Sequence, residues 1–153
     1  MNQGQHANLT GKFLENQVQK RVSDSGYDVI ENKKFDINTT WLFNNIYIKH
    51  CYICDSIYDT KMYTDILLFH KDKHPNKLAI EIKWQQVPGS VDEKYPYIVE
   101  NIKHAFPCPA IIILDGGGYK IGAKQWLKRQ IDDKLIGVYS LVEFMAWANN
   151  GGI

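Results

Sequence analysis

"TDILLFHKDKHPNKLAIEIKWQ", residues 64–85, decides how the chain folds, because two apolar runs flank a polar segment that contains a proline. Each run, 64–70 and 78–85, has the length of a buried strand. The polar residues 71–77 between them suit a hairpin loop. We therefore predict two neighbouring antiparallel strands that are connected by this loop.

The second of these strands carries a polar residue at every second position. Side chains alternate between the two faces of a strand, so Glu81, Lys83 and Gln85 share one face. The residues between them are apolar and belong to the core. The polar face must contact solvent, a partner or a ligand, since a strand that served only the core would not contain it.

The hairpin brings an acidic residue of the first strand to this polar face. With the loop centred on His74, Asp65 is predicted to lie opposite Lys83, with Glu81 on the diagonal. Directly opposite residues have Cβ atoms about 5 Å apart, and diagonal ones about 7–8 Å. Two carboxylates at such a separation repel each other unless a cation lies between them.

These three residue types together are suited to phosphodiester hydrolysis. Oxygen ligands without soft donors favour Mg²⁺ or Mn²⁺. A lysine beside such an ion can hold an attacking water, help to deprotonate it, or contact phosphate oxygens. Asp65, Glu81 and Lys83 therefore predict a metal-dependent hydrolytic site. The alternative is an exposed sheet face with surface ion pairs, the usual setting of a Glu-x-Lys tripeptide.

The first part of the chain predicts one helix and a less regular region. An apolar repeat at helical spacing begins after Thr10, a suitable N-cap, and ends at Gly26. A weak strand is expected at 27–35. The aromatic-rich stretch 36–63 is interpreted as strand and loop.

The part after the hairpin alternates between helices and strands. We expect a helix from Ser90, an apolar strand and glycine turn in 109–118, a helix at 122–133, a strand at 135–140 and a last helix from Ser140. Both serines have a glutamate three residues later, the spacing of a capping box. This order predicts an α/β or α+β fold, with a mixed sheet flanked by helices.

Composition sets broad limits on what the protein does. The chain has 153 residues, of which 44% are hydrophobic and 23% charged, so we expect one globular domain over 1–153. A net charge of +1 excludes a global basic field. Three cysteines without a signal peptide, and no apolar run near the roughly 20 residues of a membrane helix, predict a cytoplasmic protein with no membrane segment.

The polar strand and its partner resemble the PD-(D/E)xK nuclease superfamily, which has the restriction-endonuclease-like fold. Its pattern is an Asp at the start of one strand, a hairpin, and Glu-x-Lys in the next strand. Asp65 in "YTDILLF" and Glu81-Ile82-Lys83 in "AIEIKW" match it. Thr64 stands where a Pro often precedes the Asp, a position at which the Pro is frequently replaced.

Two further residues extend the resemblance. Families with this fold often have an acid on the first helix, as Glu15 in "GKFLENQVQ", and a polar residue after the lysine, as Gln85. The segment "IIILDGGGYKIGAKQWL" is similar to the strand, glycine loop and helix that follow the hairpin in some restriction-enzyme-like proteins. The resemblance spans most of the chain, from Gly11 to about Leu127.

The resemblance implies a role for each matched residue. Asp65 and Glu81 would hold Mg²⁺, for which Mn²⁺ can substitute, with the backbone carbonyl of Ile82. Lys83 would position or activate the attacking water. Two residues would have supporting roles. Glu15 would assist a second metal or the hydration shell, and Gln85 would orient Lys83 or touch the scissile phosphate.

The implied function is a metal-dependent endonuclease that acts on DNA, in a restriction-endonuclease-like role as a small enzyme or a cleavage subunit. One active site cuts one strand, so double-strand cleavage would require a homodimer or a partner subunit. Three alternatives stay open at this point. They are a structure-selective nuclease of the Holliday-junction-resolvase kind, a catalytically inactive nucleic-acid-binding domain of the same fold, and a zinc-binding regulator.

The remaining motifs carry less information. "HCYIC", residues 50–54, contains a Cys-x-x-Cys without a second pair of zinc ligands, so buried structural cysteines are expected. "DGGGYK", residues 115–120, is interpreted as a tight turn whose amides could also face DNA phosphate. Basic residues that could contact phosphate, or form a solvated face, are Lys71, Lys73, Lys77, Lys94, Lys103, Lys120, Lys124, Lys128 and Arg129.

Overall fold

The computed structural model describes residues 3–31 and 34–153, with side chains for residues 10–31 and 34–153. Six strands form one sheet in chain order, β1-β2-β3-β4-β5-β6. The strands are β1 (Asp28–Ile30), β2 (Asn45–Asp55), β3 (Lys61–His70), β4 (His74–Trp84), β5 (Ala110–Asp115) and β6 (Leu135–Tyr139). β2, β3 and β4 pair antiparallel, whereas β1, β5 and β6 each join a neighbour in parallel. The predicted mixed sheet is therefore confirmed.

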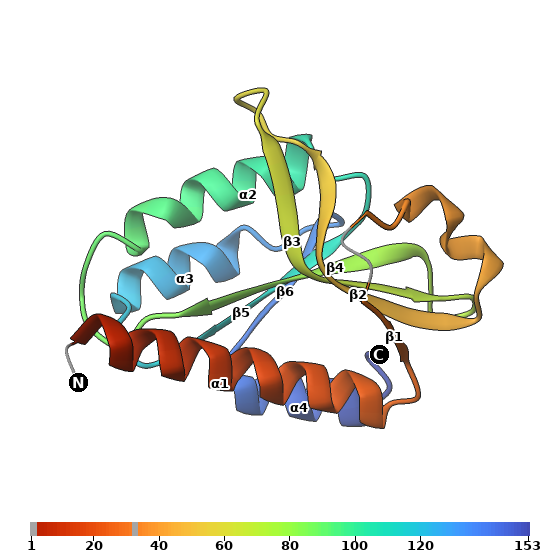
Figure 1. Ribbon diagram of the computed structural model, residues 1–153. Helices are drawn as coiled ribbons and strands as arrows, with labels where there is room; N and C mark the ends of the chain where they lie inside the picture. Colours follow the sequence, from red (N-terminus) through yellow and green to blue (C-terminus); the bar gives the residue numbers. More distant parts are fainter. Residues whose placement is uncertain (1–2, 32–33) are drawn as a thin grey trace.

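Helices cover both faces of this sheet (Figure 1). One face packs against α1 and α4, and the other against α2 and α3. The helices are α1 (Gln3–Asp24), α2 (Tyr95–His104), α3 (Ile121–Arg129) and α4 (Leu141–Asn149), with 3-10 turns at Ile37–Leu42 and Asp92–Lys94. None of the helices in the described part of the chain is long and apolar enough to cross a membrane.

The two core layers follow from the periodicity of helix and strand. Leu14, Val18 and Val22 repeat every fourth residue along α1 and are fully buried against the sheet. β5 lies between β4 and β6 and is buried on both faces, as expected for a central parallel strand. Its side chains alternate between the layers: Ile111 faces α1 and α4, and Ile112 faces the α2 side.

The predicted boundaries need correction before the hairpin. α1 begins at Gln3, seven residues before the predicted N-cap Thr10. The strand expected at 27–35 is only three residues long, Asp28–Ile30. The region 36–63 is more regular than predicted, because it holds a 3-10 turn, the whole of β2 and the start of β3. Tertiary pairing with β3 orders this aromatic-rich sequence.

The hairpin itself is shorter than predicted. β4 begins at His74, so the predicted loop 71–77 is wrong and only residues 71–73 form the turn. Pro75 lies inside the strand, which is tolerated because the ladder is irregular there. The register shifts between Leu68 and His70, and Lys77 has a φ of +68°. A bulge of this kind bends the strand and absorbs extra residues.

The two predicted capping boxes have different outcomes. Ser140 forms one with Glu143 at the start of α4. The helix predicted from Ser90 is present but begins later, at Tyr95, because residues Asp92–Lys94 form a 3-10 turn. Pro96 fits the first turn of α2, where its missing N–H leaves no helical bond unmade.

The glycine loop after β5 packs tightly against the end of β4. The backbone N–H of Gly118 donates a hydrogen bond to the carbonyl of Gln85 at 2.7 Å. A Cβ on Gly118 would overlap the backbone of Gln86 and Val87. Gly116 has a φ of +106°, and a Cβ there would lie 2.5 Å from the Gln85 oxygen. The predicted tight turn is thus a close backbone approach that supports the polar strand.

We expect Gly118→Ala to lower the free energy of unfolding by more than about 2 kcal/mol, because backbone must move to admit the methyl group. Gly122→Ala is the matched control, since a Cβ at Gly122 meets nothing within 4 Å. That control should change stability by no more than about 1 kcal/mol, in the stabilising direction. Urea unfolding of both variants measures the difference, and equal stability would contradict the close approach.

Candidate active site

The site forms where β3 and β4 separate. Their regular pairing ends at Ile66 and Ile80, whereas the β2–β3 pairing continues to Asp55 and Lys61. The outer half of β2 and β3 therefore rises from the sheet toward α2 (Figure 1). β4 stays paired with β5 as far as Trp84. Beyond Ile80, the edge of β4 toward β3 is thus no longer paired in a regular ladder. The side chains on the polar face of β4 lie beside this opening.

Asp65 closes this opening with its side chain. Its Oδ2 accepts a hydrogen bond of 2.7 Å from the backbone N–H of Ile82. A carboxylate thereby satisfies a backbone donor that the separated strand no longer satisfies. The predicted register, with Asp65 opposite Lys83, is wrong by two residues. Because Ile66 pairs with Ile80, the residue opposite Asp65 is Glu81.

Asp65, Glu81 and Lys83 nevertheless lie together. The Lys83 Nζ donates a hydrogen bond of 3.1 Å to Glu81 Oε2 and lies 3.8 Å from Asp65 Oδ2. Only 3% of the Glu81 side chain is exposed, against 25% for Asp65 and 32% for Lys83. Two acids and one base therefore form a compact cluster, which carries one excess negative charge when both acids are ionised.

Burial perturbs both charged members on β4. It raises the pKa of Glu81, and the nearby Asp65 raises it further, while Lys83 partly offsets these effects. Burial alone lowers the pKa of Lys83, but Glu81 and Asp65 together raise it above its ordinary value. The Oε1 atom of Glu81 is buried and has no hydrogen-bond partner among the described residues. The cluster thus lacks a positive partner for this oxygen.

A hard divalent ion fits this deficit. Mg²⁺ usually binds through one or two carboxylates and keeps several waters, and Asp65 and Glu81 offer two carboxylates. No group of three or more His, Cys, Asp or Glu side chains in the described part of the chain is arranged to hold a metal. Cys51 lies in the apolar core on the α2 side, and Cys54 packs against it.

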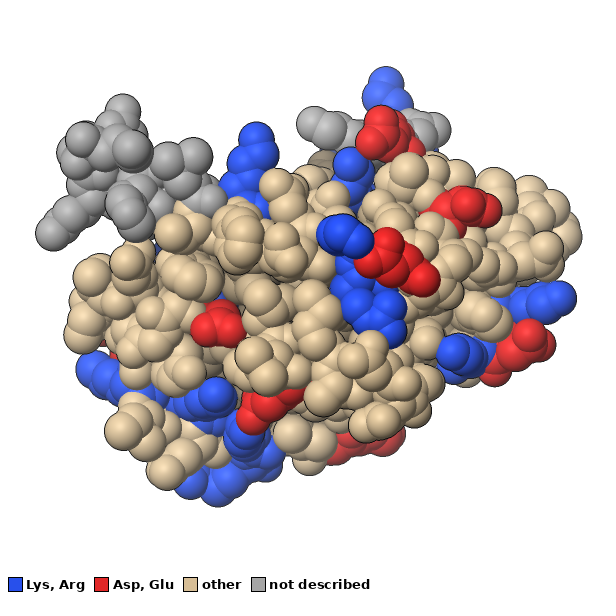
Figure 2. Space-filling model, turned by 90° about the horizontal axis from the view of Figure 1, so that it is seen from below, with Lys and Arg blue, Asp and Glu red and all other residues tan. Residues whose placement is uncertain are grey.

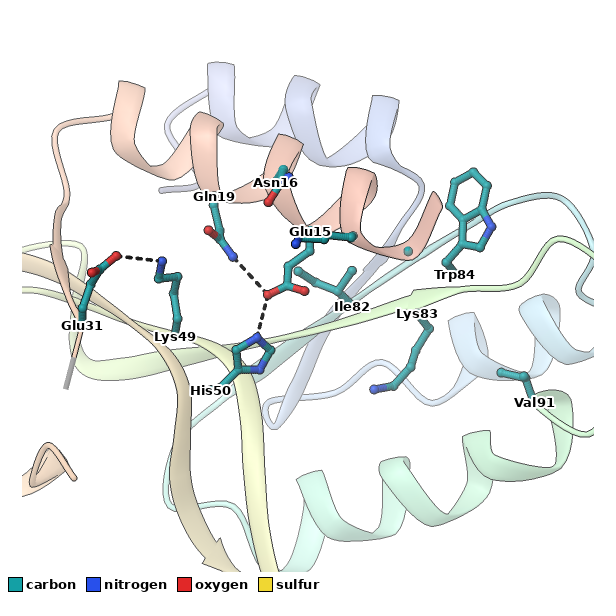
Figure 3. Close-up of a pocket in the computed structure, with 12 residues that line it drawn as sticks. Glu15, Asn16, Gln19, Glu31, Lys49, His50, Ile82, Lys83, Trp84 and Val91 are labelled. Carbon is teal, nitrogen blue, oxygen red and sulfur yellow. Dashed lines mark hydrogen bonds and ion pairs between the residues drawn. The ribbon is translucent and has the colours of Figure 1, made fainter. Parts of the chain in front are cut away.

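Glu15, the acid on the first helix, lines a pocket of about 930 Å³ that Lys83 also lines. Glu15 of α1 and His50 of β2 point toward one another there, and Lys83 extends into the space beside them (Figure 3). Glu15 Oε1 lies 2.8 Å from His50 Nε2 and accepts a hydrogen bond of 3.0 Å from Gln19. Glu15 therefore lines the pocket together with Lys83, and its carboxylate is held by His50 and Gln19.

The comparison with known families agrees with this geometry. The family described as the PD-(D/E)XK nuclease superfamily domain matches residues 6–152. The chain belongs to this superfamily. The match confirms the resemblance carried by the hairpin residues and covers nearly the whole chain. Neither the curated proteins nor the solved structures include a match. Nuclease activity, a nucleic-acid substrate and a divalent metal are what membership of this superfamily supports.

Gln85 of this nuclease domain is bound on three sides. It is buried, and its Oε1 accepts a hydrogen bond of 2.6 Å from the Tyr95 hydroxyl. Its Nε2 donates to the carbonyls of Val87 and Gly118 at 3.4 and 3.5 Å. These contacts connect the end of β4 to α2 and to the glycine loop. None of the hydrogen bonds found for Gln85 in the described residues goes to Lys83.

His50 is a pocket residue to which the sequence analysis assigned no role at the site. Its φ of +47° is unusual for a residue with a side chain. Ile48 and Cys51 both pack on the α2 side although they are three residues apart, so the normal alternation breaks at His50. The left-handed backbone thereby turns the imidazole toward Glu15. Nothing in "NIYIKHCYICD" signals such a conformation, because it depends on the bend of β2.

Several of the basic residues predicted to contact phosphate lie away from the site or pair with other groups. Lys71 and Lys73 occupy the β3–β4 turn, six or more residues beyond Asp65 and so about 20 Å away along the strand. Lys73 donates to the carbonyl of Ile153 at 2.7 Å. Lys128 of α3 pairs with Glu143 at 3.3 Å. On the side of the molecule shown in Figure 2, most of the surface is uncharged, and basic side chains gather at its lower left.

The buried Glu81 predicts a pH-dependent cost of folding without metal. A raised folded pKa means that its contribution to stability is fully present below the ordinary glutamate value of 4.5 and is lost as the pH rises through the raised value. Glu81→Gln cannot ionise. In chelator, the stability of the variant relative to wild type should therefore increase from about pH 4 to about pH 8.

Thermal unfolding across this pH range measures the difference. Glu93→Gln, an exposed glutamate in the 3-10 turn, is the control and should follow the wild type. A constant difference between Glu81→Gln and wild type would show that the carboxylate is not strained by burial.

Proposed function

We propose that this domain, over residues 1–153, is a Mg²⁺-dependent endonuclease that hydrolyses DNA phosphodiester bonds. The observation that carries the proposal is the buried Glu81 carboxylate, whose Oε1 has no partner in the described residues, beside Asp65 and Lys83. Asp65, Glu81 and the Ile82 carbonyl would hold the ion, and Mn²⁺ could replace Mg²⁺. When bound, the ion would polarise the phosphoryl group and make a water more acidic.

Lys83 is the residue of this chain best placed to contact the reacting groups. Its ammonium lies at the edge of the pocket and is held by Glu81 and Asp65. Because these acids raise its pKa, Lys83 is a hydrogen-bond donor at neutral pH. A donor there can orient the attacking water or neutralise a phosphate oxygen as a point charge. Backbone and side-chain contacts fix its strand on both sides.

Glu15 and Gln85 are proposed to support this centre from opposite sides. Glu15, held by His50 and Gln19, would accept hydrogen bonds from the water shell of the ion or assist a second ion. Gln85 would fix the end of β4, and so the position of Lys83, through its bond to Tyr95. Both roles follow from placement near the pocket and the strand end.

The biological role proposed for the domain is restriction-endonuclease-like cleavage of DNA in the cytoplasm, as a small enzyme or a cleavage subunit in restriction-modification. One active site cuts one strand, so double-strand cleavage would require a homodimer or a partner subunit. A structure-selective nuclease that acts on junctions is the second candidate. It is favoured by the exposed aromatic surface on β2 and β3.

Lys83→Ala and Asp65→Asn should each lower the rate of Mg²⁺-dependent DNA cleavage by at least about 100-fold, the size of effect seen when one transition-state contact is lost. Lys71→Ala, in the distant β3–β4 turn, is the control and should cleave normally. Supercoiled plasmid and a four-way junction are the substrates. Linear product, nicked circle or resolved junction separates the proposed roles, and undiminished cleavage by Lys83→Ala would end the assignment.

Metal binding should also raise the thermal stability of the protein. An ion that binds only the folded protein stabilises it by about 2.7 kcal/mol at one hundred times its dissociation constant. Thermal unfolding of the wild type should therefore shift upward with Mg²⁺ or Mn²⁺, while Asp65→Asn should shift far less. Lys71→Ala should respond as wild type does. A shift that Asp65→Asn retains in full would place the ion elsewhere.

A further inference from the structure

The outer half of β3 carries a cation and an aromatic ring on one face, next to the acidic residue of the site. Lys61 and Tyr63 are exposed and Asp65 is partly exposed, while Met62 and Thr64 between them turn inward. Alternate residues of a strand lie about 7 Å apart. A cation and an aromatic ring thus lie four and two residues from Asp65, along the strand that leaves the active site.

A second aromatic ring from β2 widens this row. Tyr52 is the direct cross-strand partner of Tyr63, and the two ring centroids lie 6.0 Å apart at an interplanar angle of 74°. The side opposite to this pair is buried, since Cys51 and Thr64 are both fully inaccessible. Tyr52 and Tyr63 are nevertheless 40% and 53% exposed. Their rings are therefore presented on the surface by a strand pair whose other face is in the core.

Neighbouring residues hold the Tyr52–Tyr63 pair and its hairpin in place. The Tyr52 hydroxyl donates a hydrogen bond of 3.1 Å to Asp55, which limits rotation of the ring. At the hairpin tip, the buried Asn101 of α2 accepts a hydrogen bond of 2.9 Å from the backbone N–H of Ile57. Tyr58 stacks on Tyr97 of α2 with centroids 5.0 Å apart. A surface that is rigid before binding loses less entropy when a ligand stacks on it.

We propose that Tyr52 and Tyr63 form a stacking platform for unpaired bases of the nucleic-acid strand that is being cut. This inference rests on the proposed function, in which the scissile phosphate lies at Asp65. A base next to that phosphate would lie over Tyr63, and Lys61 would contact the backbone beyond it. Base pairs inside a duplex have no free faces, so the platform selects single-stranded or branched DNA.

The direct test measures binding without catalysis. In chelator, fluorescence anisotropy compares a labelled single strand, a duplex with a single-stranded tail and a blunt duplex. The wild type should bind the first two more tightly than the third. Tyr63→Leu should weaken binding to the single strand by about 10-fold, the worth of one stacked base, and the Tyr52→Leu/Tyr63→Leu variant by more. Leucine keeps an apolar cross-strand pair, so the hairpin is retained.

Two matched variants separate stacking from other effects. Tyr63→Phe keeps the ring and should bind as wild type does, whereas loss of affinity in that variant would assign the effect to the hydroxyl. Trp41→Leu removes an exposed aromatic ring in the 3-10 turn Ile37–Leu42, outside the strand pair, and should leave the preference for unpaired bases unchanged. Equal affinity of the double leucine variant and wild type for the single strand would overturn the platform.

A second measurement uses only the wild-type protein, so it decides even if a variant fails to fold. A single strand that contains 2-aminopurine should lose fluorescence when its base stacks on a tyrosine. Unchanged fluorescence of bound strand would refute stacking. Quenching without any metal-dependent cleavage would leave the platform and remove the proposed hydrolysis. Metal-dependent cleavage by the wild type, together with unchanged fluorescence of the bound strand, would leave the proposed hydrolysis and remove the platform.

Discussion

The hydrogen bond from the Ile82 backbone to the Asp65 carboxylate is the constraint on which the site depends. It replaces a ladder bond that is lost where β3 turns away from β4. Without such an acceptor, the buried N–H would remain unsatisfied at a cost of about 1–3 kcal/mol. The same side chain thus completes the sheet and places a negative charge beside Glu81. Structure and chemistry are therefore coupled at one residue, and Asp65→Asn keeps an acceptor while removing the charge.

The separation of the strands also explains why the polar face has access to substrate. Had β3 remained paired with β4, both strands would lie flat beneath α2, which covers this face of the sheet. The outer hairpin instead bends away, and the left-handed backbone of His50 lets β2 follow while it presents a ring to α1. The pocket between α1 and β4 results from the same bend. Local backbone strain of this kind is typical of functional sites.

Much of the site could be predicted because it depends on local alternation. The polar face of Glu81 and Lys83, and the presence of Asp65 on the preceding strand, follow from strand geometry and a hairpin. The register could not be predicted, since a bulge and Lys77 with positive φ shorten the turn. The contact of Gln85 with Tyr95 and the conformation of His50 arise only from tertiary packing. Sequence spacing carries no information on either.

The balance of charge among Asp65, Glu81 and Lys83 determines how the cluster would bind a cation. Without metal, the Lys83 ammonium is the nearest cation to both carboxylates and partly neutralises them. It contacts Oε2 of Glu81, while no described residue pairs with the buried Oε1. One cation therefore serves two acids, and the excess negative charge is retained in a place where burial makes it costly.

A divalent ion at the carboxylates would remove that excess and free the lysine for the phosphate side of the pocket. β4, which carries Glu81, is braced by β5, the glycine loop and Tyr95, and Asp65 is bound to the Ile82 N–H, so the two carboxylates are held close together. The proposed affinity for a cation would therefore depend on the rigidity of β4 and on the bond between Asp65 and the Ile82 N–H.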